Sequence, residues 1–126
     1  NFMTVYFAFV YRAGVDSWDE KVILVLGGAG GVGVAATQVG KLLGSTIIAC
    51  ASTSVKRKFC IEHGADYAVD YSQRSRYRDV LQMNNGAGAD CVLDPVGGDY
   101  MLGCLRCTRI GGCILTIGYL IVSVLT

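Results

Sequence analysis

The chain has 126 residues, of which 52% are hydrophobic and 17% charged, and its formal net charge is +1. This length suits one domain that buries about two-thirds of its unfolded surface. The near-neutral charge excludes the strong positive field that holds nucleic acid or an anionic membrane surface. No charged residue follows Arg109, but that stretch is shorter than the ~20 residues of a membrane helix and is interrupted by glycine.

Hydrophobic periodicity divides the chain into alternating helices and strands. Residues 4–13 carry apolar side chains at helical spacing and Gly14 follows, which predicts a helix with a glycine C-cap. The run 22–26 (VILVL) is typical of a central parallel strand. After it, the pattern predicts helices at 30–43, 54–63, 74–83 and 100–108, and strands at 46–51, 67–69, 89–93 and 113–117, the last entered through a Gly111–Gly112 turn.

This alternation determines the expected fold class. Connections of helical length favour parallel strands, right-handed crossovers and helices on both sides of the sheet. We therefore predict a single α/β domain, with a Rossmann-type doubly wound parallel sheet and helices on both faces.

Six cysteines raise the question of disulfides or a metal. Cys104 and Cys107 form the only CxxC pair, which falls inside a predicted helix, and neither a second pair nor the lone His63 completes four ligands. We expect buried thiols in a reducing compartment, and no metal site.

The segment most informative about function is GGAGGVG, residues 27–33. Gly28, Gly30 and Gly33 satisfy G-x-G-x-x-G, between a predicted buried strand and a predicted helix. Such glycines turn the chain sharply, admit a pyrophosphate close to the backbone and let the helix pack on the strand. The free amides at the helix start then favour an anion. The alternative is a strand–helix turn without a ligand.

The residues after the second predicted strand bear on which nucleotide is bound. NAD-preferring domains usually carry Asp or Glu here to bind the adenosine ribose, whereas this chain has Ser52, Thr53 and Ser54, followed by Lys56 and two more basic residues. Hydroxyls and cations suit a 2′-phosphate, so we predict NADPH over NADH. The alternative is a helix capped by Ser52 or Ser54 with a solvated basic face; the two interpretations are compatible.

Three more segments follow strands whose carboxyl ends should meet at the ligand edge of the sheet. Val96 and Gly97 follow the fourth strand, Gly118 and Tyr119 the fifth, and Tyr71 the third. The first two pairs would lie along the nicotinamide half of a dinucleotide, or serve as structural turns. Tyr71 would flank the adenosine phosphate or cover the sheet. No catalytic triad, carboxylate dyad or metal set is evident, so catalytic residues stay unassigned.

The ordered motifs resemble the coenzyme domain of the zinc-independent quinone oxidoreductases, in the medium-chain dehydrogenase/reductase superfamily. The resemblance covers roughly residues 4–119 and rests on KVILVLGGAGGVGVAATQVGKLLG, IIACASTSVKRKF, HGADYAVDYS, GAGADCVLDPVGGDY and LRCTRIGGCILTIGY. It implies an NADPH-binding domain of an enzyme that delivers hydride from NADPH to quinones or activated enones.

The resemblance also implies roles for individual residues. The turn Gly30–Gly31–Val32–Gly33 would hold the nucleotide. Ser52, Lys56 and Tyr71 would bind the 2′-phosphate. The positions expected near the nicotinamide are Val96, Gly97, Gly118, Tyr119 and, at the start of the linking helix (residues 1–15), Thr4 and Tyr6.

The chain departs from the resembled family at both ends. Family members carry a preceding GroES-like catalytic domain, which we expect this chain to lack, so that the chain alone would bind NADPH weakly and turn over poorly. Residues 120–126 (LIVSVLT) differ from the usual Ser-Gly loop. This apolar tail would add an edge strand, pair with another copy or promote aggregation. Family members often dimerise through the edge strand, which implies a homodimer.

Two rival interpretations remain. The chain would be a non-catalytic nucleotide-sensing or protein-interaction module derived from a reductase, or a folded remnant that no longer binds nucleotide. We expect a cytoplasmic location and, in the full-length protein, a small quinone or enone as the substrate.

Overall fold

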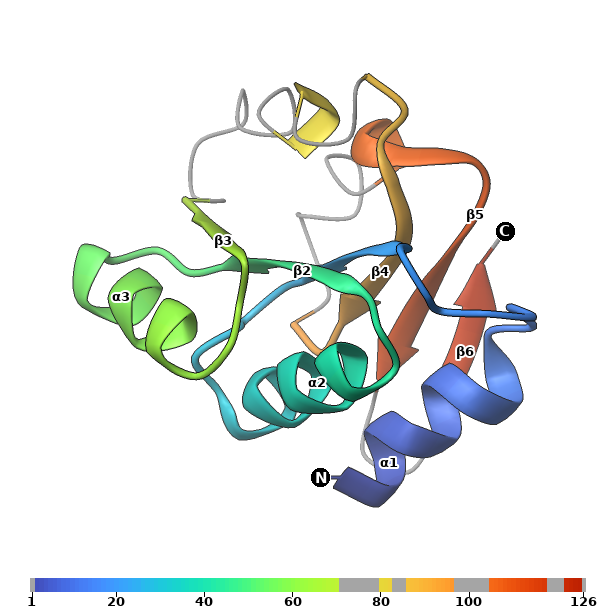
Figure 1. The fold of residues 1–126 in the computed structure, drawn as a ribbon, viewed down its shortest axis with the longest axis horizontal. Coiled ribbons are helices and arrows are strands. Elements are labelled where there is room, and N and C mark those ends of the chain that lie inside the picture. Colours follow the sequence, from blue (N-terminus) through green and yellow to red (C-terminus); the bar gives the residue numbers. More distant parts are fainter. Residues whose placement is uncertain (1, 71–79, 83–85, 97–104, 118–121, 126) are drawn as a thin grey trace.

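The computed structural model describes residues 2–70, 80–82, 86–96, 105–117 and 122–125, and Figure 1 traces their helices and strands. Six strands within these ranges form one sheet in the order β3-β2-β1-β4-β5-β6. The first five pair in parallel, and β6 pairs antiparallel with β5. The strands are β1 (Val22–Val25), β2 (Thr46–Cys50), β3 (Tyr67–Val69), β4 (Ala89–Asp94), β5 (Thr108–Ile117) and β6 (Val122–Leu125).

The strand order changes direction at β1. The chain runs outward through β2 to β3, then returns to pair β4 with the other side of β1. In an open α/β sheet, such a reversal leaves a crevice beyond the carboxyl ends of the two central strands. The ligand edge predicted from the sequence is therefore the edge reached by β1 and β4.

The core has two halves, one on each face of the sheet, because successive strand residues point to opposite faces. Ile23 and Val25 belong to one cluster of buried residues, whereas Val22 and Leu24 belong to the other. Since all four are buried, both faces of β1 are covered. This explains the continuous apolar run that predicted a central strand.

Four helical segments cover the first face (Figure 1): α1 (Phe2–Phe7), the π-helix η1 (Ala8–Arg12), α2 (Gly31–Leu42) and α3 (Ser54–Glu62). Val5, Phe9, Ala36 and Cys60, one from each segment in that order, belong to the first cluster. Gly40 allows α2 to lie close to the sheet, since a Cβ there would be 2.6 Å from the Ile47 Cδ1 atom.

The second face is covered by helical residues at 80–82 and 105–107. Val80 and Cys107 from these segments belong to the second cluster. Burial raises the pKa of the Cys107 thiol to about 11, as expected when the charged form is desolvated. The prediction of helices on both faces is thus confirmed, although most of the predicted helices 74–83 and 100–108 lie outside the described residues.

The first predicted helix, 4–13, differs from the α-helix expected. Its second half is a π-helix, in which the Ala13 N–H donates to the Ala8 carbonyl at 3.0 Å. The carbonyl of Phe9 accepts from the Trp18 indole at 3.1 Å, and the two rings pack with centroids 5.1 Å apart. Gly14 follows with φ +69°, so the predicted glycine termination is confirmed.

The Gly111–Gly112 turn expected before the fifth strand is instead part of β5, which begins at Thr108. The β4–β5 register passes from Ala89↔Thr108 to Cys91↔Cys113, so extra residues on β5 bulge out of the ladder. Gly111, at φ +82°, supplies the backbone conformation that this bulge needs. The prediction was wrong because a glycine pair indicates a bend without showing whether strand pairing resumes on both sides.

The apolar tail contributes the edge strand β6, in register with Ile114–Ile117 of β5. Of the alternatives considered for residues 120–126, addition of an edge strand is the one observed within this chain. An antiparallel partner needs only a short connection, whereas another parallel strand would need a long crossover.

Candidate nucleotide-binding site

The glycine segment forms a tight turn between β1 and α2. Gly27 has φ +60° and its carbonyl accepts from Gly30 N at 3.0 Å, while Gly28 N donates to the Cys50 carbonyl at 2.9 Å. Helix α2 then begins at Gly31, with Gly30 as an N-cap that makes no side-chain hydrogen bond. The first amides of the helix have no partners within it, so they and the helix dipole offer a site for an anion.

At two positions of the turn, neighbouring segments lie so close that only glycine fits. A Cβ on Gly33 would collide with the Gly27 carbonyl oxygen and lie 2.7 Å from the Gly28 Cα. A Cβ on Gly28 would lie 2.8 Å from the Ala49 Cβ of β2. Gly33 therefore packs α2 against the turn and Gly28 packs the turn against β2, the roles expected of a dinucleotide-binding turn.

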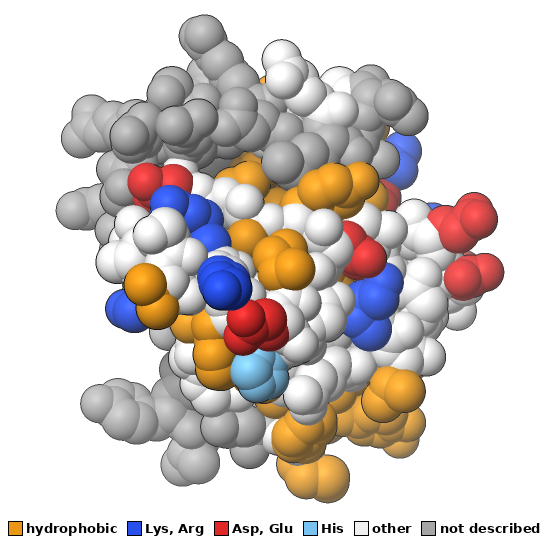
Figure 2. Space-filling view, turned by 60° about the vertical axis from the view of Figure 1, so that its left-hand side comes forward, with side chains coloured by type: hydrophobic (Ala, Val, Ile, Leu, Met, Phe, Trp, Pro, Cys, Tyr) orange, Lys and Arg blue, Asp and Glu red, His pale blue; other side chains and the backbone are white. Residues whose placement is uncertain are grey.

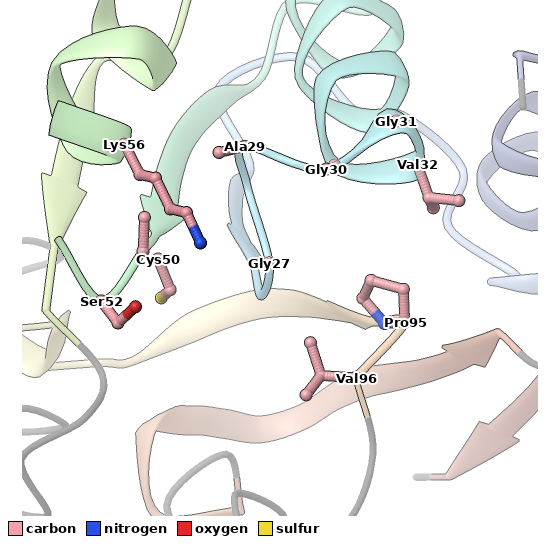
Figure 3. A pocket seen from close by; sticks show the side chains of 12 residues that line it. Gly27, Ala29, Gly30, Gly31, Val32, Cys50, Ser52, Lys56, Pro95 and Val96 are labelled. Atoms are coloured by element: carbon pink, nitrogen blue, oxygen red, sulfur yellow. The ribbon is translucent and has the colours of Figure 1, made fainter.

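A cavity of about 410 Å³ opens beside this turn, at the carboxyl ends of β1, β2 and β4 (Figure 3). Its volume is within the usual range for small-molecule sites. Four of the glycines line it, together with side chains from the ends of two strands, β2 and β4, from the start of two helices and from Ala29 of the turn. The lining residues are Gly27, Ala29, Gly30, Gly31, Val32, Gly33, Cys50, Ala51, Ser52, Lys56, Pro95 and Val96.

One end of the cavity is polar. Ser52, from the β2–α3 connection, and Lys56, from the first turn of α3, direct their hydroxyl and ammonium groups into the space beside Gly27 (Figure 3). Both residues are exposed. The hydroxyl and the cation are donors suited to a phosphate oxygen, so the structure brings together the Ser52–Lys56 pair predicted from the sequence.

The cap of α3 differs from the prediction. Neither Ser52 nor Ser54 is the N-cap; Thr53 is, and its Oγ1 accepts from Lys56 N at 3.2 Å. Thr53 has the extended backbone of an N-cap residue (φ −118°, ψ 153°), while Ser54 is already helical. Because Thr53 caps the helix, the Ser52 hydroxyl remains available to the cavity.

The next two basic residues of α3 do not line the cavity. Arg57 donates to the Ala51 carbonyl at 3.0 Å and lies 3.8 Å from the Asp70 carboxylate. Lys58 is exposed and does not line the cavity. Figure 2 shows the face carrying α3, with basic side chains dispersed among exposed apolar ones. Part of the basic run therefore forms a solvated face of α3, which was the alternative to a phosphate site.

The other end of the cavity is apolar, formed by Pro95, Val96 and Val32. Asp94, the last residue of β4, is fully buried, and its Oδ1 accepts from Val96 N at 3.0 Å. This local bond holds the turn after β4 in position. Val96 therefore lines the cavity, and its place beside a nicotinamide stays a prediction.

Several predicted site residues are not brought to this cavity. Thr4 and Tyr6 are exposed on α1 and do not line it. Tyr71, Gly97, Gly118 and Tyr119 lie outside the described residues, as does Cys104. Their roles stay predictions.

Sequence analysis did not name Ala29, Cys50 and Ala51 among the nucleotide-binding residues, although they line the cavity. Cys50 and Ala51 end β2 and follow it directly. The rule that ligands bind beyond the carboxyl ends of parallel strands was the signal that pointed to them.

Neither a metal-binding group of side chains nor a membrane-spanning helix is present in the described residues. No group of three or more His, Cys, Asp or Glu side chains is arranged within them to hold a metal ion. In the same ranges, no helix combines the length and hydropathy needed to cross a membrane. The described cysteines, Cys50, Cys60, Cys91, Cys107 and Cys113, are buried, as predicted.

Comparison with known proteins identifies the family. The model of the zinc-binding dehydrogenase family matches residues 31–124, which is most of the chain. The match begins within the glycine segment, at Gly31. The chain belongs to this family. More closely, it is a coenzyme-binding domain of the kind found in quinone oxidoreductases of the medium-chain dehydrogenase/reductase superfamily, as the sequence motifs predicted.

Curated relatives of this zinc-binding dehydrogenase domain are much longer proteins. The quinone oxidoreductase of Pseudomonas aeruginosa is 35% identical over 98 residues, 78% of this chain and 30% of the relative. The squalestatin hexaketide synthase clz14 of Cochliobolus lunatus is 31% identical over 121 residues, 93% of this chain and 5% of the relative. The chain thus spans about a third or less of the curated relatives it matches.

Solved structures share the fold of this domain. A mycobacterial protein complexed with NADPH is 28% identical with a TM-score of 0.84, and the match covers 93% of this chain and 36% of that one. An NAD-dependent alcohol dehydrogenase is 34% identical with a TM-score of 0.85, covering 91% and 33%. The described residues therefore have the nucleotide-binding fold of this superfamily.

Proposed function

We propose that this domain binds NADPH in the cavity between the glycine turn and α3. The observation that carries the proposal is the placement of Ser52 and Lys56 at one end of a cavity whose wall is the turn before α2. A diphosphate suits the open amides at Gly31–Gly33, and a 2′-phosphate suits Ser52 and Lys56. An NADPH complex among the solved relatives supports the choice of cofactor.

The cavity fits such a group for a physical reason. A Cβ on Gly30 would meet only the Gly27 carbonyl oxygen, at 3.4 Å, so the glycine leaves open the space that a phosphate needs near the backbone. The residues that would hold the nucleotide are Gly31 and Val32 by their amides, Ser52 and Lys56 by side chains, and Val96 by apolar contact. When bound, NADPH would supply the hydride.

We infer further that the protein containing this domain is a reductase that transfers hydride to a quinone or an activated enone. The relatives named quinone oxidoreductase support the first substrate class, and a solved CurK enoyl reductase, 25% identical, supports the second. In such a protein this domain positions the cofactor and excludes water from one side of it. The GroES-like catalytic domain would close the other side.

The test is a titration of the purified chain with NADPH and, separately, NADH, followed by nicotinamide fluorescence or calorimetry. We expect Lys56→Ala to weaken NADPH binding roughly tenfold, about 1.4 kcal/mol, because one charge-assisted contact at an exposed site is lost. Binding of NADH, which has no 2′-phosphate, should change little.

Lys58→Ala is the matched control, because it removes the same charge two residues further along α3 and outside the cavity. Equal losses for the two variants would show a general charge effect and contradict the proposed 2′-phosphate site. If neither nucleotide binds at millimolar concentration, the interaction-module or remnant interpretation replaces the proposal.

A further inference from the structure

Two cysteine thiols lie side by side on neighbouring strands of the sheet. Cys91 on β4 and Cys113 on β5 are register partners, and both side chains belong to the cluster covered by α1 and η1. Parallel strands are spaced about 4.7–4.9 Å apart, within the Cα separations of about 4.4–6.8 Å that disulfides span. The two thiols also form a hydrogen bond with each other. Their strand positions are therefore compatible with a covalent bond.

A second cavity, of about 310 Å³, lies near this pair, although neither cysteine lines it. Its lining includes Asp90 and Gly112, the residues immediately before Cys91 and Cys113. Val15 lines the same cavity and packs against the cluster that holds the thiols. Cys91 is fully buried and Cys113 is 4% exposed. Of the two thiols, Cys113 is thus the more accessible to a small solute.

The local chemistry assigns different roles to the two thiols. The hydrogen bond with Cys113, together with burial, raises the pKa of Cys91 well above its usual value. The same hydrogen bond lowers the pKa of Cys113. Since the thiolate is the nucleophilic form, Cys113 is the thiol that attacks first.

We propose that Cys91 and Cys113 form a reversible disulfide when the protein meets a peroxide. The Cys113 thiol first releases its proton; the thiolate then attacks one peroxide oxygen and the O–O bond breaks. The released hydroxide takes up the proton that Cys113 gave up and becomes water. The Cys91 sulfur then attacks the resulting sulfenic acid, the S–S bond forms, and a second water leaves with the Cys91 proton. In sum, two thiols and one hydrogen peroxide give one disulfide and two waters.

The position of the bond determines its consequence for the fold. It would join β4 to β5 at the first registered pair after the bulge, where the ladder is interrupted. The closed loop would contain Pro95 and Val96, which form the apolar end of the nucleotide cavity. Closing a loop in the unfolded chain stabilises the folded state, so the oxidised protein should resist unfolding more than the reduced protein.

The experiment treats the folded, reduced wild-type chain with hydrogen peroxide and follows its intact mass and its digest under non-reducing conditions. We expect the loss of two hydrogen atoms and a cross-linked peptide pair joining Cys91 to Cys113. Cleavage after Arg106 and Arg109 places the two cysteines on separate peptides, and a further cleavage before Asp94 and Asp99 separates Cys91 from Cys104. The thermal midpoint should rise on oxidation and return when dithiothreitol is added.

Cys107→Ala is the matched control, since Cys107 is also a buried cysteine but belongs to the cluster on the other face. This variant should form the cross-link as the wild type does, whereas Cys91→Ala and Cys113→Ala should not. If either of those variants fails to fold, the peptide map of the wild type decides by itself. A cross-link through other cysteines, or addition of oxygen without a cross-link, would overturn the proposal.

Discussion

Glycines of the same turn have different physical requirements. Gly33 is confined by backbone atoms, since its Cβ would overlap the Gly27 carbonyl oxygen, and backbone cannot move aside as a flexible side chain can. Gly30 is not confined in this way and has φ −78°, a value open to any residue. Gly33 is therefore needed for the fold, whereas Gly30 is needed, under the proposed function, for the approach of the nucleotide.

This difference predicts opposite results for two alanine substitutions. Gly33→Ala should lower the free energy of unfolding by about 1–3 kcal/mol, the usual cost of overpacking. Gly30→Ala should cost about 1 kcal/mol or less, as an N-cap change, but should weaken nucleotide binding because the new methyl group occupies the phosphate approach. Urea unfolding and nucleotide titration of both variants test this. Equal losses of stability in the two variants would contradict the distinction between Gly33 and Gly30.

Lys56 and Arg57 illustrate how adjacent residues of the same charge type acquire different environments. Neighbouring helix positions point about 100° apart, so Lys56 lines the cavity while Arg57 donates to the Ala51 carbonyl. Arg57 thereby joins α3 to the end of β2. The sequence run KRK indicates a cationic surface but does not say which of its members faces the ligand.

At the scale of elements, the first turn of α3 carries both the helix cap and the lysine at the polar end of the cavity. Thr53 caps the helix through Lys56 N, and this bond fixes the backbone of the residue whose side chain enters the cavity. Helix α3 buries little apolar surface, since Cys60 is its only buried residue. The cap should therefore contribute noticeably to the position of α3.

We predict that Thr53→Ala lowers the free energy of unfolding by about 1 kcal/mol, because an orphan amide of α3 loses its acceptor. Ser54→Ala, one residue further on, should have little effect, since Ser54 is not the cap. Chemical denaturation of both variants provides the comparison. A larger loss for Ser54→Ala than for Thr53→Ala would contradict the cap assignment.

At the scale of the whole molecule, the proposed function makes the described residues one half of a site. The cavity is bounded by the glycine turn, β2, α3 and the end of β4, and the curated quinone oxidoreductase is about three times as long as the stretch matched here. The sheet ends on one side at β6, the kind of edge through which the resemblance implies a homodimer. That association, the cytoplasmic location and the zinc-independence stay predictions.

This arrangement predicts weak or undetectable turnover by the 126-residue chain. We expect no quinone-dependent loss of NADPH absorbance above the uncatalysed background, because no part of the described chain closes the substrate side of the cavity. The measurement requires a chain already shown to bind NADPH by titration, so that failure to bind is not mistaken for failure to react. Robust turnover by this chain would contradict the need for a second domain.

Local patterns were sufficient where one physical requirement dominates. The VILVL run predicted β1 because only a strand covered on both faces tolerates uninterrupted branched aliphatic residues. The glycine motif predicted the turn before α2 because a Cβ is excluded at Gly28 and Gly33. The order of these segments predicted the doubly wound sheet, since parallel strands need crossover helices.

Other features were decided only by the tertiary structure. Thr53, not Ser52 or Ser54, caps α3 because backbone geometry selects among three adjacent hydroxyls. Gly111 and Gly112 lie in a bulge because β4 pairs with β5 on both sides of it. The sequence by itself determined the fold class, the glycine turn and the basic run, which depend on local sterics and periodicity; the cap, the bulge, the pairing of Cys91 with Cys113 and the direction of Lys56 depended on contacts between distant segments.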